Sequence, residues 1–408
     1  MKANDFQNNL WTLLSSGISA IFVSVMVFVT VRTIGLAEAG MLSFAAAVGG
    51  ISQLLVMFSV RPIQSTDINQ EYSLNSYLGL RVFSALFASA VVVVFLIISG
   101  FELNRIIVIF LVYMIYFIDG FFDLFMGDLQ QKGKMRIAGR MRVCAFGICM
   151  VVFTVFAVLT KTIIIPLCIS CASIFIVYII WIWFYRRQFK QVRINFDKTI
   201  IKKLTIAVLP LLIGTFIYSF LFNSQKYYLN FLVSDESVAI ISILILPTSF
   251  LSILCSSLFM GAEMTKTAKM FINGQLKQMS RRVNYQFLFA VIISAVFVLC
   301  SLTFGIPLLS WVFNNDLSMY QQEFLIITLG GVSFVFLAVL GGVMITMRLQ
   351  KINLYNIITI AIIAGPISWF LVLQYGILGA AYTSMIIFIP FAVSSFIVYK
   401  VSLNRMIK

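Results

Sequence analysis

The chain has 408 residues, of which 61% are hydrophobic and only 11% are charged, and its formal net charge is +15. This composition excludes a soluble globular domain and is typical of a protein embedded in a membrane. The basic excess requires no nucleic acid as a partner, because basic loops beside anionic lipid headgroups account for it. The chain contains no histidine, and we expect no catalytic residue, no metal site and no cofactor.

Twelve apolar stretches follow one another along the chain, and each is long enough to cross a bilayer, which takes about 20 mostly apolar residues. The first stretch is too long for the core of a signal peptide, so we expect it to be retained. The sequence therefore predicts an all-α integral membrane protein with helices over 10–31, 39–60, 78–100, 106–127, 138–160, 163–185, 203–222, 237–260, 285–303, 323–347, 353–373 and 378–399.

Lysine and arginine gather on alternate connections between these stretches. Basic residues near helix ends prefer the cytoplasmic side of a membrane, so their distribution sets the topology. With the N-terminus inside, most of the 29 basic residues fall on inner segments. We therefore expect both termini in the cytoplasm. The outer loops then hold only Arg32, Arg105, Lys161 and Lys226.

The longest basic connection, roughly 186–203, separates six helices from six helices. We predict two domains, 1–190 and 191–408, each a six-helix bundle. Because six is an even number, both halves enter the membrane from the same side, and related halves would be parallel repeats. Two such bundles enclose a central cleft, around which alternating access rocks one bundle against the other.

Two acidic residues lie inside the fourth stretch. Asp119 and Asp123 are four residues apart and so share one face of a helix. Translocon scales put the cost of one central charge at about 2.5–3.5 kcal/mol, so both must face water, hold protons or pair with cations. Two interpretations stay open: coupling to H⁺ or Na⁺, or a structural ion pair with Arg32, Arg61 or Arg81.

The connection between the second and third helices combines cationic and polar residues at the inner membrane surface. Arg61, Gln64 and Arg81 are candidates for binding a lipid-linked diphosphate, because guanidinium binds phosphate oxygens bidentately. Ordinary anchoring by positive charge is the competing interpretation. Asp67, in the same connection, is a candidate for ion coupling or for a structural ion pair.

The seventh stretch carries a polar stripe that ends in a cation. Thr215, Ser219, Asn223 and Lys226 recur at helical spacing. A single Ser or Thr in a membrane helix usually bonds to its own backbone. We expect a stripe of four to line water, and we predict that Ser219, Asn223 and Lys226 contact the substrate.

Five segments of the chain carry a family resemblance. They are Arg32-Thr-Ile-Gly35 with Ala39-Gly40, VRPIQSTDINQEYSLNSYLGLR, IDGFFDLFMGDLQQKGKMRIAGRMR, NSQKYYLNFLVSDESVAIISIL and Gly376-Ile-Leu-Gly-Ala-Ala381. These segments resemble the bacterial polysaccharide flippases of the Wzx type, in the multidrug/oligosaccharidyl-lipid/polysaccharide exporter superfamily, although Gln225-Lys226 departs from the Asp, Pro or Arg expected there. The resemblance implies twelve helices in two bundles. It also implies transport of undecaprenyl-diphosphate-linked sugar repeat units, for capsule, O-antigen or cell-wall polysaccharide, to the outer leaflet of the bacterial cytoplasmic membrane.

If the resemblance holds, Arg61, Arg81 and either Arg32 or Lys226 would neutralise phosphate. Pathway polymerases and glycosyltransferases would be partners. A multidrug-type exporter of organic cations is the nearest alternative, and it would need a net acidic cavity. A membrane polysaccharide polymerase is the alternative from another class. However, the longest predicted outer loop, about 304–322, contains no basic residue, and the chain lacks a phosphate-binding loop of the G-x-x-x-x-G-K-[ST] type.

Overall fold

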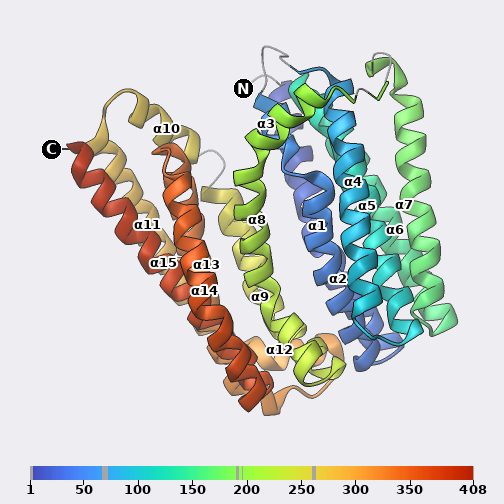
Figure 1. The fold of residues 1–408 in the computed structure, drawn as a ribbon. Coiled ribbons are helices and arrows are strands. Elements are labelled where there is room, and N and C mark those ends of the chain that lie inside the picture. Colours follow the sequence, from blue (N-terminus) through green and yellow to red (C-terminus); the bar gives the residue numbers. More distant parts are fainter. Residues whose placement is uncertain (1–2, 67–71, 190–192, 195, 260–262, 408) are drawn as a thin grey trace. The chain divides into compact units, whose positions relative to one another are not determined.

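The structure, a computed structural model, describes residues 3–66, 72–189, 193–194, 196–259 and 263–407 (Figure 1). Nearly all of these residues are helical. The α-helices are α1 (Ala3–Thr33), α2 (Leu36–Met57), α3 (Val60–Thr66), α4 (Leu74–Ile98), α5 (Leu103–Gln131), α6 (Met135–Thr160), α7 (Ile164–Phe184), α8 (Lys198–Leu232), α9 (Asp235–Leu258), α10 (Met264–Ile272), α11 (Leu276–Cys300), α12 (Ile306–Phe313), α13 (Gln321–Thr346), α14 (Gln350–Tyr375) and α15 (Ile377–Ile407).

Among the described residues, twelve helical segments are long and apolar enough to cross a membrane, which confirms the predicted fold class. Each predicted stretch overlaps one of them. The structure extends several well beyond their apolar centres: the stretch predicted over 203–222 is part of Lys198–Leu232, and the one over 285–303 is part of Leu276–Phe313. The cytoplasmic position of the termini and the central cleft remain predictions.

The chain forms two compact units, Met1–Ser219 (unit 1) and Phe220–Lys408 (unit 2). The boundary between the units along the chain falls within α8, whereas the predicted domain boundary at 190 precedes that helix. The N-terminal part of α8 packs in unit 1, where Leu204, Val208 and Leu212 join Phe58 and Leu124 in one buried cluster. The predicted division into 1–190 and 191–408 describes the grouping of apolar stretches and stays a prediction.

The same neighbour relations recur in the two units. In unit 1, α5 packs against α2 and α7, and α6 packs against α7. In unit 2, α13 packs against α9 and α15, and α14 packs against α15. By position, these are the second, fourth, fifth and sixth spans of each half. The fourth span is therefore central in both units, as expected for a duplicated bundle.

Close helix contacts in both units depend on glycine. In unit 1, a Cβ on Gly120 would lie 3.1 Å from a side-chain carbon of Val56, so α2 and α5 approach closely beside Asp119. In unit 2, Gly376 has φ +56° between α14 and α15, and a Cβ on Gly379 would lie 2.1 Å from the Leu371 carbonyl oxygen. Small residues permit such backbone approach in membranes.

The connection after α2 turns sharply before the chain continues as α3. Phe58 and Ser59 both have left-handed backbone angles, with φ near +50°, which costs L-residues roughly 1–2 kcal/mol each. Burial of Phe58 and Val60, which are 6% and 1% exposed, offsets that cost. The turn lays α3 against α5 and brings Arg61 to the face that carries the aspartates.

Candidate functional site

A cluster of charged side chains lies within unit 1. We call Arg61, Arg81, Asp119, Asp123 and Arg142 the charged cluster. They come from α3, α4, α5 and α6. Arg81, Asp123 and Arg142 lie about two turns, and Asp119 about three turns, from helix ends that belong to the predicted cytoplasmic side, whereas Arg61 is the second residue of α3. The α5 aspartates are each 1% exposed, so the cluster is buried among the helices.

Asp119 is fully hydrogen-bonded within the cluster. Its Oδ1 accepts hydrogen bonds from Arg142 Nε at 3.1 Å and from the Tyr178 hydroxyl at 2.5 Å. Its Oδ2 accepts from Arg142 Nη2 and from Gln53 Nε2, both at 2.6 Å. The Tyr178 ring stacks on Phe122, with centroids 5.0 Å apart, which fixes the hydroxyl on this carboxylate. Asp119 thus links α2, α5, α6 and α7.

Asp123, one turn along the same face, is only half satisfied. Its Oδ1 pairs with Arg61 Nη1 at 2.6 Å and lies 3.5 Å from Arg142 Nη2. Its Oδ2 has no hydrogen-bond partner in the described part of the chain. Arg61 also donates from Nε to Gln130 Oε1 at 3.0 Å. The Arg61 side chain is 25% exposed, whereas the Arg142 side chain is 16% exposed.

Arg81 is completely buried and incompletely paired. Its Nη1 donates to the Val56 carbonyl oxygen at 2.6 Å, whereas Nε and Nη2 lack partners among the residues described. It interacts electrostatically with Asp123, Arg61 and Asp119. Such a buried guanidinium is costly unless an anion or ordered water completes its shell.

The charged cluster therefore holds three guanidinium groups against two carboxylates. The formal excess of one positive charge lies where translocon scales assign about 2.5–3.5 kcal/mol to each uncompensated charge. An anion reaching the exposed edge of Arg61 would remove that excess, whereas an organic cation would increase it. The cluster is suited to binding a phosphate group.

The remaining residues predicted for the site are not members of the charged cluster. Arg32, at the end of α1, is exposed and lies over the Phe28 ring at 5.3 Å. Gln64, on α3, is buried, and its Nε2 donates to the Leu124 carbonyl at 3.3 Å. Asp67 lies outside the described residues.

The predicted polar stripe on α8 is divided between the two units. Ser219 ends unit 1, while Asn223 and Lys226 belong to unit 2, and all three are partly buried. Asp119 and Asp123 each pair with an arginine. Lys226, in contrast, forms no ion pair with an acidic side chain among the residues that the structure describes. Its neighbour Gln225 is buried and donates from Nε2 to the Ser384 hydroxyl at 2.5 Å.

Three side chains of the network were not among the predicted site residues. Arg142 takes the place of the Arg32 or Arg81 expected as a partner for the aspartates, and Tyr178 and Gln53 complete the shell of Asp119. A signal for Arg142 existed in the sequence, because it interrupts the apolar stretch 138–160 near its inner end. Tyr178 and Gln53 carry no such signal, since single polar groups of that kind are common in membrane helices.

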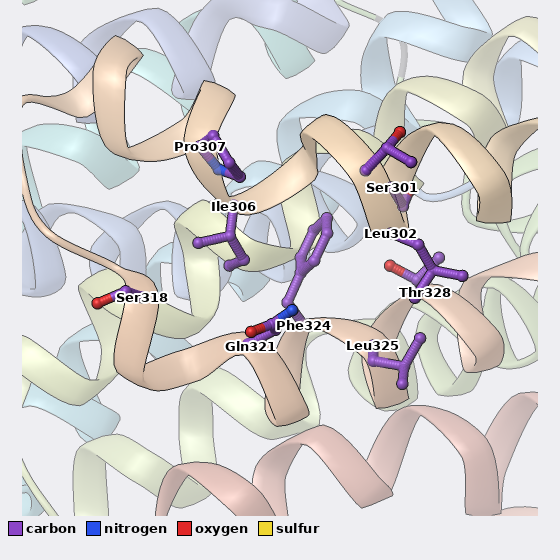
Figure 2. A pocket seen from close by; sticks show the side chains of 10 residues that line it. Ser301, Leu302, Ile306, Pro307, Ser318, Gln321, Phe324, Leu325 and Thr328 are labelled. Carbon is purple, nitrogen blue, oxygen red and sulfur yellow. The ribbon is translucent and has the colours of Figure 1, made fainter.

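Unit 2 contains a pocket of about 260 Å³ between the π-helical turn Ser301–Gly305, α12 and α13 (Figure 2). Its polar lining is uncharged and includes the Ser301, Ser318 and Thr328 hydroxyls and the Gln321 amide. The Phe324 ring lies in the space left by Gly305. These groups can hydrogen-bond a neutral ligand, but the pocket offers no cation that would neutralise a phosphate.

A second ionic group lies in unit 2 near the start of α11. Glu263 accepts hydrogen bonds from Arg282 Nη2 and Nε, both at 2.9 Å, and from Lys266 Nζ at 2.7 Å. These hydrogen bonds, of which those from Arg282 have the largest effect, lower the pKa of Glu263 to about 2. The glutamate thus stays ionised and links α10 to α11.

The fold is similar to that of solved transporters. An inward-facing multidrug resistance MATE family transporter of the MOP superfamily superposes with a TM-score of 0.72 at 12% identity, covering 95% of both chains. An outward-facing member gives 0.62 at 13% identity, over 99% of this chain and 96% of the other. A MOP superfamily transporter from Pyrococcus furiosus, described as having a binding pocket of reverse polarity, gives 0.59 at 13% identity, over 99% and 96%.

The chain therefore has the fold of the MATE transporters of the MOP superfamily. No protein-family model matches the sequence. No curated protein matches it either. At 12–13% identity the structural likeness establishes the fold, and the choice of substrate depends on the residues of this chain.

Proposed function

We propose that the chain is a flippase that moves undecaprenyl-diphosphate-linked oligosaccharide repeat units from the inner to the outer leaflet of the bacterial cytoplasmic membrane by alternating access. The fold supports transport, and the sequence resemblance supports this class of substrate. The observation that carries the proposal is the excess positive charge of the charged cluster, with Arg61 at its exposed edge.

The chemistry of the substrate explains why such a cluster is needed. Each sugar hydroxyl costs roughly 2–7 kcal/mol to remove from water without a replacement hydrogen bond. The diphosphate adds charge, so spontaneous crossing is negligible. A cation at the predicted cytoplasmic end neutralises the diphosphate there while the polyprenyl tail stays in lipid. Arginine suits this role because its planar fork binds two phosphate oxygens at once.

The other predicted site residues have subsidiary roles in this proposal. Lys226 or Arg32 would neutralise phosphate nearer the outer leaflet, and the Ser219, Asn223 and Gln64 side chains would replace water around the sugar. Asp119 and Asp123 hold arginines in ion pairs, and this geometry supports a structural role over proton or Na⁺ coupling. Polymerases and glycosyltransferases of the same pathway are proposed partners.

A multidrug-type exporter is the second candidate, because the solved structures of this fold include multidrug transporters. The charge of the site separates the two functions. An organic cation would add positive charge to a cluster that already has an excess, whereas a diphosphate would remove it. The charged cluster therefore favours an anionic substrate.

Flipping in proteoliposomes tests the proposal. Purified protein is reconstituted with a fluorescent undecaprenyl-diphosphate-linked oligosaccharide, and its movement between leaflets is followed with a membrane-impermeant quencher. We expect rapid flipping by the wild type and by the surface variant Arg405→Ala. Arg61→Ala should flip at least about tenfold more slowly, which corresponds to about 1.4 kcal/mol. Equal rates for Arg61→Ala and wild type, or transport of ethidium in place of the lipid, would refute the assignment.

A further inference from the structure

We propose that Asp123 is a resident counterion that occupies the phosphate-binding edge of Arg61 until substrate displaces it. This inference rests on the proposed function. It adds which group neutralises Arg61 when no substrate is bound and which helix contact is broken when substrate binds. Its ligand is the diphosphate group of a polyprenyl lipid. The argument starts from the contrast between the two aspartates on α5.

The two carboxylates share one helical face but differ in how firmly they are held. Asp119 accepts four hydrogen bonds from Arg142, Tyr178 and Gln53. Asp123 has one close contact, to Arg61, and one at 3.5 Å, to Arg142. Its second oxygen is unpaired within the part of the chain that the structure describes. Asp119 is a fixed part of the bundle, and Asp123 can exchange partners.

An incoming anion meets Arg61 first. A quarter of the Arg61 side chain is exposed, whereas that of Asp123 is 1% exposed and Arg81 is completely buried. The bond from Arg61 Nε to Gln130 holds the guanidinium in place independently of Asp123. The Nη groups of Arg61 can therefore exchange the carboxylate for phosphate while the hydrogen bond to Gln130 keeps the side chain against α5.

The displaced carboxylate retains positive neighbours. Arg142 Nη2 is already 3.5 Å from Asp123 Oδ1, and Arg81 interacts with Asp123 electrostatically. Arg81 also has two nitrogen atoms, Nε and Nη2, to which no described residue is hydrogen-bonded. A buried carboxylate without a cation would be strongly unfavourable, and these two arginines prevent that state. The unpaired oxygen of Asp123 and the two unpaired nitrogen atoms of Arg81 are thus explained: they are available to each other once phosphate has displaced Asp123 from Arg61.

The exchange would transmit occupancy from the site to the fold. The Arg61–Asp123 pair joins α3 to the centre of α5. Transfer of Arg61 to phosphate breaks this bond and leaves α3 attached through Gln130 and Gln64. Substrate binding thereby loosens one contact of the central helix of unit 1 while the Asp119 bonds stay intact.

The test is a binding measurement on full-length protein in nanodiscs with undecaprenyl diphosphate as the probe. If Asp123 competes with phosphate, Asp123→Asn binds the probe about tenfold more tightly than wild type, because an opposing ion pair is removed. Arg61→Ala binds it weakly, and the double variant binds no better than Arg61→Ala. Asp128→Asn, on the same helix and paired with Lys132 at 2.5 Å, serves as the matched control and keeps wild-type affinity.

Two further arms identify the chemical group that is recognised. Undecaprenol and phosphatidylglycerol should each show less than a twofold effect of Asp123→Asn, since neither presents a diphosphate. Unchanged or weaker binding of the diphosphate by a folded Asp123→Asn variant, with Arg61→Ala still impaired, overturns the exchange and leaves the proposed function standing. Failure of wild type to bind the diphosphate overturns both. Thermal unfolding of each variant verifies folding.

Discussion

Asp119 and Asp123 show how far one residue's contacts decide its role. Their spacing in the sequence predicted one shared face and a need for cations, and both lie in ion pairs. The identity of the cations was harder to predict. A sequence gives the depth of Arg142 in its helix but not the direction in which it points, and that direction depends on how α1, α5 and α7 pack around α6.

At this scale Asp119 is expected to be a stability residue. Asp119→Asn removes the nearer of the two carboxylates that face Arg142 and leaves Asp123 at 3.5 Å. Breaking one side of a buried pair costs about 3–5 kcal/mol. Unfolding of the purified protein in detergent, followed by heat or denaturant, measures the loss. Asp128→Asn, whose single ion-pair partner Lys132 has a side chain that is 31% exposed, should cost less stability than Asp119→Asn. Equal stability of the two variants would show that the Asp119 network is not structural.

The ion pair of Glu263 with Arg282 makes stability depend on pH through a glutamate that lies outside the candidate membrane spans. The pKa of Glu263 is lowered from its ordinary value of 4.5 to about 2, so the folded state favours the ionised form. The stabilisation is complete above pH 4.5 and is lost as the pH falls toward 2. Wild type should unfold at a higher temperature than Glu263→Gln at pH 7, and the difference should shrink at pH 3. A difference that does not change between these pH values would contradict the assignment.

Among the helices, the apolar stretches were predictable because each contains one long hydrophobic run. Their ends were not, because a hydrophobicity window stops at the first polar turn while backbone hydrogen bonds continue. The short helices α3 and α10 were missed in inner connections for the same reason. The region 304–322, expected as an outer loop, contains α12 and the pocket beside it.

A substitution at Gly379 is the sharpest test of a contact between two helices. A Cβ there would lie 2.1 Å from the Leu371 carbonyl oxygen, so Gly379→Ala forces α15 away from α14. We expect a loss of about 1–3 kcal/mol, the usual cost of overpacking. Gly50→Ala is the control, because nothing lies within 4 Å of its Cβ and alanine favours helix by about 0.5–1 kcal/mol. Gly379→Ala with unchanged stability would show that the two helices are not in this contact.

For the whole molecule, the charge distribution predicts that both termini lie in the cytoplasm. The prediction is tested with single cysteines in a variant that lacks the six native ones. Lys134→Cys and Lys161→Cys occupy exposed positions at opposite ends of α6. In intact cells an impermeant maleimide should label position 161 and should reach position 134 only after permeabilisation. The reverse pattern would invert the topology.

The division of the apolar stretches into six and six predicted that the two units would share the same neighbour relations. The sequence also shows that the central helix of unit 1 carries Asp119 and Asp123, whereas α13 carries a single acidic residue, Glu323, in its first turn. The pairing of Asp119 with Arg142 was not predicted. Duplication predicts a common framework, and the chemistry added to one copy appears only when side chains from several helices are brought together.

If the proposed function holds, the uncompensated guanidinium in unit 1 makes the unloaded protein sensitive to voltage. A cell that is negative inside attracts one excess positive charge inward by up to about 2.3 kcal/mol per 100 mV of potential difference crossed. The proposed loaded state would have the opposite sign, because a diphosphate would outweigh that single charge. The resting potential is thus expected to draw an unloaded carrier back toward the side where its cargo waits and to help drive the loaded one outward.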